Sequence, residues 1–325
     1  MSVLERFEKK DETALARLIS LVENREKNYE KVLAGLFPHS GKAFRIGVTG
    51  PPGAGKSTLV DKLAILYLKE KKTVGIVAVD PTSPFTGGAL LGDRIRMQGA
   101  SERKAAFIRS MATRGSQGGL AAATGDVALV LDAFGKDYIF LETVGVGQVE
   151  LDIASQADVT LLVLVPESGD SIQAMKAGLM EIADIFVVNK SDREGSRKMV
   201  AELDMVLNFK RQKGEWRYPV LPTEGVNSVG IDTLLDTIDE YRRFAVEHHL
   251  FETKRKKQIK VSLLGMVERK IRTRAEAALK SELDKLIEKV WKREVDPYSA
   301  VEELPLDFAR CGEPAEPLAA DSQLS

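Results

Sequence analysis

The sequence is poor in the residues that build disulfide frameworks and soft-metal sites. Its 325 residues include one cysteine, Cys311, and three histidines, His39, His248 and His249. One cysteine cannot form an internal disulfide or a zinc site alone, so the composition fits the reducing cytosol. The chain also lacks an excess of either charge, with 47 Lys and Arg against 48 Asp and Glu. Because a phosphate backbone is bound by a basic surplus, we expect no nucleic-acid partner.

Long apolar runs are missing as well. The first stretch, MSVLERFEKKDETALARL, is charged, has a helical pattern and lacks the apolar core of a secretion signal. No segment approaches the roughly 20 apolar residues that cross a bilayer. We therefore expect a soluble, cytoplasmic protein without a membrane partner.

The rhythm of apolar residues divides the chain into four parts. Residues 1–42 carry leucine, isoleucine and valine at helical spacing, which predicts an N-terminal helical segment. Residues 43–246 alternate short β-rich runs with helical stretches. Residues 247–305 show no strand signal and predict a helical extension, in which we interpret the basic run Lys254–Lys257 as a solvated helix face. Residues 306–325 are rich in Pro, Ala and Ser and predict a disordered tail.

The second part predicts the fold class. Its β-rich runs are 44–49, 73–80, 105–110, 137–143, 158–165 and 184–189. They are almost continuously apolar, as in strands of a parallel sheet covered on both faces. Helices are expected to begin near Lys56, Gly118, Val149, Ser171 and Ser196, with another at 230–246. The alternation predicts an α/β fold with a doubly wound, mostly parallel sheet and helical extensions at both ends.

A phosphate-binding loop lies between the first predicted strand and helix. Gly50-Pro51-Pro52-Gly53-Ala54-Gly55-Lys56-Ser57 matches G-x-x-x-x-G-K-[ST] at every fixed position. Glycines let backbone N–H groups curl around phosphates, and the helix N-terminus favours an anion. We expect Lys56 to reach the β- and γ-phosphates, Ser57 to bind Mg²⁺ and Thr58 to lie near the α-phosphate.

Three carboxylates are candidates for the magnesium end of this site. Asp80 and Glu142 each close an apolar strand, at the sheet edge where ligands bind in such folds. Asp93 lies in a glycine-rich loop. Glu142-Thr-Val-Gly145 takes the place of D-x-x-G in most GTPases, so Gly145 would offer its N–H to the γ-phosphate. Gln148 is a candidate for orienting the attacking water, although its position does not fix that role. Glu142 could hold a magnesium-bound water or the attacking water, and the sequence does not separate these two roles.

A second loop predicts the base that is read. Asn189-Lys190-Ser191-Asp192 follows an apolar strand and matches N-K-x-D. The aspartate accepts hydrogen bonds from guanine N1–H and the N2 amine, a donor pair that adenine lacks. Glu224-Gly225-Val226 stands where many GTPases have Ser-Ala-x, with Glu as a departure. These motifs predict that residues 43–246 form a P-loop GTPase domain that binds GTP or GDP with Mg²⁺.

The longer motifs resemble one family. They are Asp80-Pro-Thr-Ser-Pro through Gly92-Asp93, Arg114-Gly-Ser-Gln-Gly-Gly119 and Glu142-Thr-Val-Gly-Val-Gly-Gln148. Together they are similar to the MeaB/ArgK GTPases, which include the human methylmalonic aciduria type A protein, over about residues 1–305. The resemblance implies a chaperone of an adenosylcobalamin-dependent acyl-CoA mutase, chiefly methylmalonyl-CoA mutase, that gates cofactor loading and protects the mutase.

The same resemblance implies several assignments. Family members are homodimers held partly by the C-terminal helical extension. Asp80, Asp93 and Glu142 match magnesium-site positions of the family. The loop 166–176 matches a switch that links nucleotide state to the mutase, with Asp170, Gln173 and Lys176 as its candidate contacts.

Hydrolysis is expected to be slow without a partner. Catalysis would rest on positioning by Lys56, Mg²⁺ and the loop amides. Arg94, Arg96 and Arg114 lie in candidate switch loops, but none qualifies as an arginine finger. Two alternatives stay open: a nickel-insertion metallochaperone GTPase, which the few histidines disfavour, and a nucleotide-gated regulator of amino-acid transport.

Overall fold

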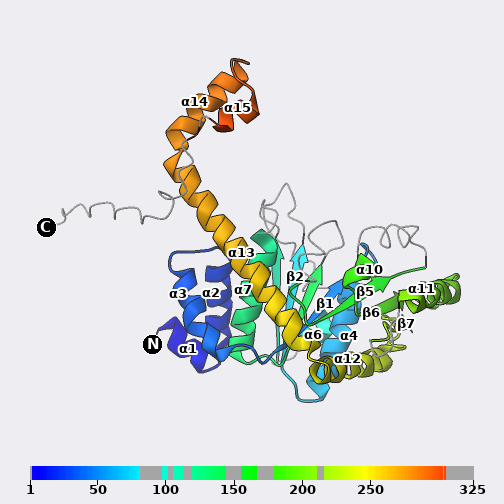
Figure 1. Ribbon diagram of the computed structural model, residues 1–325. Coiled ribbons are helices and arrows are strands. Elements are labelled where there is room, and N and C mark those ends of the chain that lie inside the picture. Colours follow the sequence, from blue (N-terminus) through cyan, green and yellow to red (C-terminus); the bar gives the residue numbers. More distant parts are fainter. Residues whose placement is uncertain are drawn as a thin grey trace. The chain divides into compact units, whose positions relative to one another are not determined.

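The computed structural model has a seven-stranded sheet, in which every strand is parallel to its neighbours. It describes residues 2–80, 97–101, 105–112, 119–143, 155–166, 179–210, 216–302 and 304. The strands are β1 (Phe44–Thr49), β2 (Val74–Asp80), β3 (Ala106–Ala112), β4 (Tyr138–Thr143), β5 (Val159–Leu164), β6 (Ile185–Asn189) and β7 (Val220–Thr223). Their order across the sheet is β3-β2-β4-β1-β5-β6-β7. In Figure 1, the labelled strands β2, β1, β5, β6 and β7 follow one another from left to right in this order.

The burial of the strands explains their uniform apolar character. Every residue of β4, β5 and β6 is buried, because helices cover both faces of the sheet. The six predicted runs coincide with β1 to β6 to within two residues at each end. The remaining strand, β7, contains Pro222 and lies at the edge of the sheet, where a missing N–H is tolerated. The structure confirms the predicted doubly wound α/β fold.

Helices form a layer on each face of this sheet. One face packs against α4 (Lys56–Lys69), α6 (Gln98–Ser101) and α12 (Ile231–Glu247). The other face packs against α7 (Gly119–Phe134), α10 (Leu179–Ile182) and α11 (Ser196–Lys210). The predicted starts of α4, α7 and α11 agree with these bounds, whereas those at Val149 and Ser171 fall outside the described residues.

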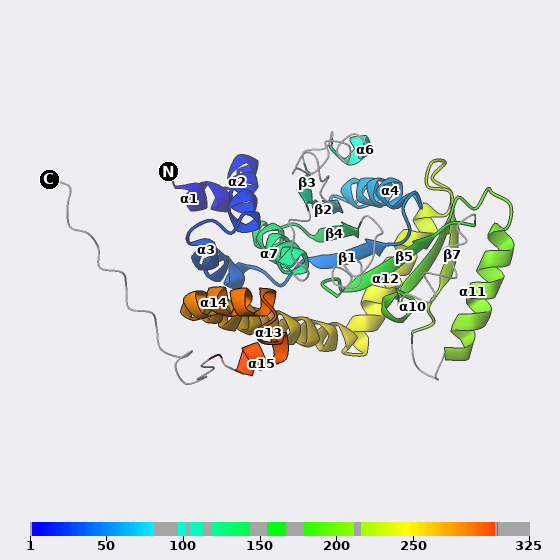
Figure 2. The same cartoon turned by 90° about the horizontal axis from the view of Figure 1, so that it is seen from above.

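The N-terminal helices form a further layer. They are α1 (Val3–Glu8), α2 (Glu12–Glu23) and α3 (Tyr29–Leu36), followed by the short 3₁₀ helix η1 (Phe37–His39). Asp11 caps α2 by accepting hydrogen bonds from the N–H groups of Thr13 and Ala14. The apolar stripe of α2, including Leu15 and Ile19, is buried with residues of α7. In Figure 2, α7 accordingly lies between these helices and the sheet.

Helix α13 (Leu250–Ala278) begins as part of this assembly. Lys254 Nζ donates to both carboxylate oxygens of Asp184 at 2.7 and 2.8 Å. Arg255 donates to both oxygens of Asp158 at 3.0 and 2.9 Å. The interpretation of Lys254–Lys257 as a solvated face is therefore wrong for its first two residues. Their partners stand just before β6 and β5, far away in sequence, so the run itself gave no sign of the pairing.

The described chain divides after Gln258 into two compact units. The second unit contains the rest of α13 together with α14 (Lys280–Trp291) and α15 (Pro297–Glu302). Asp296 begins α15 by accepting hydrogen bonds from the N–H groups of Tyr298 and Ser299, which confirms the predicted break at Asp296-Pro297. None of the described helices combines the length and apolar character that a membrane span requires.

Candidate nucleotide-binding site

The loop between β1 and α4 has a backbone that only glycine fits. Gly50 has φ +137°, and a Cβ there would lie 2.0 Å from the carbonyl oxygen of Val163. Gly55 has φ +89°, and a Cβ there would lie 2.3 Å from Nδ2 of Asn189. Real Cβ contacts are not this short, so both glycines are required by close approach as well as by backbone angle. The result is a tight loop that leads into the N-terminus of α4.

Lys56 spans this loop from the first position of α4. Its Nζ donates to the carbonyl oxygens of Gly50 at 2.7 Å and Pro51 at 3.0 Å. The side chain is buried, which is costly for an ammonium group unless oxygen atoms surround it. The lysine is thus held over the loop, at the helix end whose dipole and free N–H groups favour an anion.

The next residue links the loop to β4. Ser57 Oγ donates to Oε1 of Glu142 at 2.5 Å, and Glu142 is buried near the end of β4. Asp80 is the last residue of β2, which pairs with β4, so it ends at the same edge of the sheet. Hydroxyl and carboxylate oxygens are the donors that Mg²⁺ prefers, so this set of residues fits that ion. Asp93 and Gly145 lie outside the described residues.

Asn189 connects the phosphate loop with the base loop. Its Nδ2 donates to the carbonyl oxygen of Ala54 at 2.7 Å. Its Oδ1 accepts from the N–H of Gly225 at 3.0 Å and from the hydroxyl of Thr223 at 3.1 Å. Asn189 is buried, so these bonds are made without competition from water. The end of β6 therefore holds the two loops in a fixed relation.

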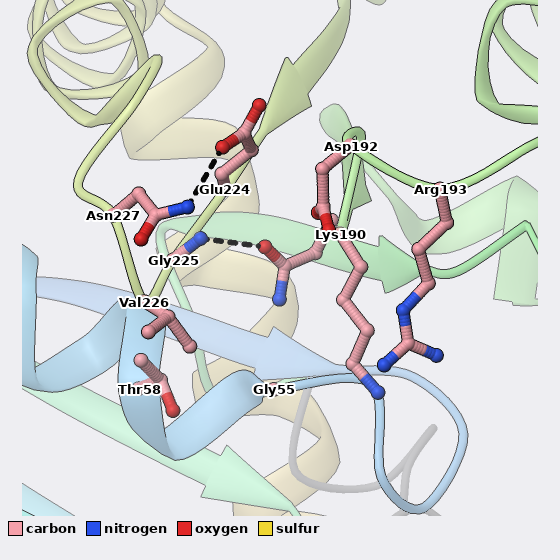
Figure 3. A pocket seen from close by; sticks show the side chains of 10 residues that line it. Gly55, Thr58, Lys190, Asp192, Arg193, Glu224, Gly225, Val226 and Asn227 are labelled. Atoms are coloured by element: carbon pink, nitrogen blue, oxygen red, sulfur yellow. Dashed lines mark hydrogen bonds between the residues drawn. The ribbon is translucent and has the colours of Figure 1, made fainter.

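A pocket of about 290 Å³ opens beside this asparagine. It is lined by Gly55, Thr58, Asn189, Lys190, Asp192, Arg193, Glu224, Gly225, Val226 and Asn227. Figure 3 shows Lys190 and Arg193 on one side and Val226 and Thr58 on the other. The volume is close to the lower end for ligand pockets, roughly 300 Å³, and suits one part of a ligand such as a base.

The base loop closes on itself through Glu224. Glu224 and Val229 exchange backbone hydrogen bonds at 3.0 and 3.2 Å, and Asn227 Nδ2 donates to Oε2 of Glu224 at 3.1 Å. Glu224 in place of the usual serine thus has a local role in the loop. The backbone N–H of Gly225 is used by Asn189, as the dashed line in Figure 3 marks. Since this N–H donates to Asn189, its hydrogen bond gives no support to a contact between Gly225 and guanine O6.

The structure brings together the predicted residues that it describes. Residues 50–58 contact Glu142 through Ser57 and contact the base loop through Ala54 and Asn189. The loops 189–192 and 224–226 line one pocket with Gly55 and Thr58. Two pocket residues, Arg193 and Asn227, were not predicted. Each directly follows a predicted motif, and this position was the one sign in the sequence that they could line the pocket. The candidate partner contacts Asp170, Gln173 and Lys176 lie outside the described residues, as do Gln148 and the three candidate arginines.

Comparison with known proteins identifies the family to which the chain belongs. Residues 15–280 match the family described as methylmalonyl-CoA mutase-associated GTPase MeaB. A Pyrococcus abyssi relative is 50% identical over 304 residues, covering 92% of this chain and 94% of the relative. GTPase ArgK of Escherichia coli is 35% identical, with 74% of this chain and 75% of the relative covered. The mouse protein named methylmalonic aciduria type A homolog, mitochondrial, is 35% identical over 70% of this chain and 56% of its own length.

A solved structure gives the same result for the fold. The crystal structure of a LAO/AO transport system kinase aligns with a TM-score of 0.71 and 25% identity, covering 95% of this chain and 96% of the other. The family match includes the phosphate loop, the end of β4 and the base loop described above. The chain belongs to the MeaB family of methylmalonyl-CoA mutase-associated GTPases, and it binds guanine nucleotide and hydrolyses GTP.

Proposed function

We propose that this GTPase is a chaperone of an adenosylcobalamin-dependent acyl-CoA mutase, with methylmalonyl-CoA mutase as the first candidate. It would gate loading of the cofactor and protect the mutase from inactivation. The observation that carries the proposal is the family match over residues 15–280, because that family is described by its association with this mutase. The mouse relative, named for methylmalonic aciduria, supports the same assignment.

Two groups of residues around the phosphate loop would carry out the hydrolytic chemistry, one binding the phosphates and the other binding Mg²⁺. Lys56 lies at the N-terminus of α4 and would hold the β- and γ-phosphates, together with the loop N–H groups. Ser57, Glu142, Asp80 and Asp93 would hold Mg²⁺. When bound, Mg²⁺ neutralises the charge that develops on the phosphate oxygens. The protein's own contribution is positioning and charge stabilisation, so we expect slow turnover that a partner raises.

The base would be read at Asp192, with Lys190 covering its plane. Both side chains line the pocket beside Asn189, opposite Val226 (Figure 3). A carboxylate facing guanine N1–H and N2 would be left without donors by adenine, which favours GTP over ATP. Glu224, Gly225 and Val226 would close the other side of the base.

The readout of nucleotide state would pass through the loop after β5. Asp170, Gln173 and Lys176 are the proposed contacts of this loop with the mutase. The loop follows β5, and the carbonyl of Val163 in that strand packs against Gly50 of the phosphate loop. A change at the phosphates would thereby have a short route to the partner surface.

We also propose a homodimer formed through the extension 247–305. Within the second unit, one stretch of α13 exposes a series of large apolar side chains. They are Val261, Leu264, Val267 and Ile271, each 47–53% exposed. Comparing the oligomeric state of the wild-type chain and the Val267→Lys variant by sedimentation tests this surface. Lys260→Glu is the control, because it changes charge without removing an apolar group. A wild-type chain that sediments as a monomer would contradict the dimer.

Complex formation tests the chaperone proposal. Purified chain is mixed with methylmalonyl-CoA mutase and analysed by sedimentation velocity, with GDP and with a non-hydrolysable GTP analogue. We expect a complex whose affinity differs between the two nucleotides. No complex with either nucleotide, for this mutase and for other cobalamin-dependent acyl-CoA mutases, would defeat the proposal.

One alternative has an observation in its favour. The aligned solved structure is described as a transport system kinase, which suggests a regulator of amino-acid transport. Capture of membrane transport components, without a mutase, from extracts that contain both would support this alternative. Nickel insertion has less support, since the described residues contain no group of three His, Cys, Asp or Glu side chains placed to hold a metal ion.

A further inference from the structure

Two buried threonines join the strands that carry the phosphate loop and Glu142. Thr49 is the last residue of β1 and directly precedes Gly50. Thr143 is the last residue of β4 and directly follows Glu142. The hydroxyl of Thr143 donates to Oγ1 of Thr49 at 3.1 Å, and the two residues are 2% and 1% exposed. We call them the threonine pair.

The register of the sheet explains why these hydroxyls meet. β1 and β4 are parallel, with Val48 aligned with Glu142, so the next position on each strand brings Thr49 opposite Thr143. Side chains alternate between faces along a strand, so Glu142 and Thr143 point to opposite faces of the sheet. Glu142 meets Ser57 at the start of α4, while Thr143 meets Thr49 on the other face.

The end of β4 is thus fastened to both flanks of the phosphate loop. The threonine pair holds it to the residue before Gly50, and the Ser57–Glu142 bond holds it to the residue after Lys56. A slip of β4 by one residue would turn both side chains to the wrong faces and break both bonds. Two bonds on opposite faces also restrict twisting of the strand end, which one bond alone would allow.

Packing alone does not require hydroxyl groups at these two positions. Valine has nearly the same shape as threonine, favours strands equally and needs no partner when buried. A hydroxyl buried without a partner destabilises the fold, so each threonine makes the other necessary. The pair therefore adds a directional link at the point where β4 meets the phosphate loop.

We propose that Thr49 and Thr143 are positioning residues for GTP hydrolysis, which hold Glu142 in place against Ser57. The inference concerns the hydrolytic site of the family and not the mutase. Absence of a mutase complex would therefore defeat the proposed function and leave this inference standing.

The test separates positioning from stability with a double substitution. Thr143→Val leaves the Thr49 hydroxyl without its donor and should lower the melting temperature. Thr49→Val/Thr143→Val removes both hydroxyls, and most of the melting temperature should return. If the pair positions Glu142, kcat stays low in the double variant, roughly three- to tenfold below wild type. KM for GTP should change less than twofold, since the base pocket is untouched.

Three further measurements make the result decisive. Thr143→Ser keeps the hydroxyl and should retain most of wild-type kcat. The Mg²⁺ concentration that half-saturates GDP binding should rise in the double variant, a readout that needs no turnover. Glu142→Gln gives the size of the effect when the carboxylate itself is changed. Recovery of kcat together with melting temperature in the double variant would overturn the proposal, as would wild-type kcat in Glu142→Gln. If Thr143→Val alone does not fold, the double variant decides.

Discussion

The side-chain amide of Asn189 donates to the carbonyl oxygen of Ala54 at 2.7 Å, although 135 positions separate the two residues. The same asparagine accepts from the N–H of Gly225 at 3.0 Å. One buried side chain therefore fixes the distance between the loop that holds phosphates and the loop that closes the base pocket. One nucleotide must place its phosphates in the phosphate loop and its base in the base pocket at the same time. The distance that Asn189 sets between the two therefore determines whether a nucleotide can make both sets of contacts.

Replacing this asparagine should weaken nucleotide binding as a whole. Asn189→Ala leaves the Ala54 carbonyl and the Gly225 N–H without their partner, at about 1–3 kcal/mol for each buried group. We expect GDP and GTP affinity to fall roughly tenfold to a hundredfold, measured by fluorescent nucleotide titration. Asn227→Ala, an exposed asparagine on the same pocket, is the control. Equal affinity loss in the two variants would contradict the bridging role.

Adding one methyl group at Gly55 should distort the same link. The Cβ of Gly55→Ala would lie 2.3 Å from Nδ2 of Asn189, and the residue has φ +89°. We expect a loss of about 1–3 kcal/mol in the free energy of unfolding, measured without nucleotide. Gly53→Ala is a matched control, because φ is also positive at +75° but nothing lies within 4 Å of its Cβ. A similar loss of unfolding free energy in the two variants would mean that the effect comes from the positive φ alone and not from the contact with Asn189.

The base preference should change with a single substitution at Asp192. Asparagine in its place presents an N–H donor where guanine also presents donors, so GTP affinity should fall roughly a hundredfold. Xanthine carries an oxygen instead of the 2-amine, and Asp192→Asn should therefore bind XTP better than GTP. Competition of GTP and XTP for a fluorescent nucleotide checks this reversal. An unchanged preference for GTP would mean that Asp192 does not read the base.

The start of α13 should contribute strongly to the stability of the GTPase unit. Arg255 is 18% exposed and its partner Asp158 is fully buried, so Arg255→Ala removes the ion pair and leaves that carboxylate with the backbone N–H of Arg45 as its remaining hydrogen-bond donor among the described residues. Loss of one partner from such a pair costs about 3–5 kcal/mol, which denaturant unfolding would report. Lys256→Ala is the control, since its pair with Glu252 is exposed and helical. A loss below 1 kcal/mol for Arg255→Ala would show that the pair is dispensable.

Much of the fold was available from local sequence. Continuous apolar runs predicted β1 to β6, because burial on both faces of a parallel sheet requires them. The motifs also predicted which strand ends would converge, since ligand sites form at the carboxyl ends of such strands. The phosphate loop lies directly between β1 and α4, as its pattern required.

The relationships that the sequence did not reveal are pairings over long distances. Arg255 meets Asp158, and Thr143 meets Thr49, only because strand order and register place them together. In the sequence, a run of lysine and arginine on a helix looks the same whether its side chains face water or pair with aspartates of other elements. Likewise, a strand-end threonine is an ordinary strand residue until its neighbour in the sheet is known.

Steady-state GTP turnover with increasing methylmalonyl-CoA mutase tests the central claim most directly. Wild type should turn over slowly alone, and its kcat should rise to a saturating value as the mutase is added. Asp192→Asn should show no such rise with GTP but should recover it with XTP, which ties the effect to this nucleotide site. A turnover that stays constant over the whole range of mutase concentration, for this and other cobalamin-dependent acyl-CoA mutases, would contradict the account.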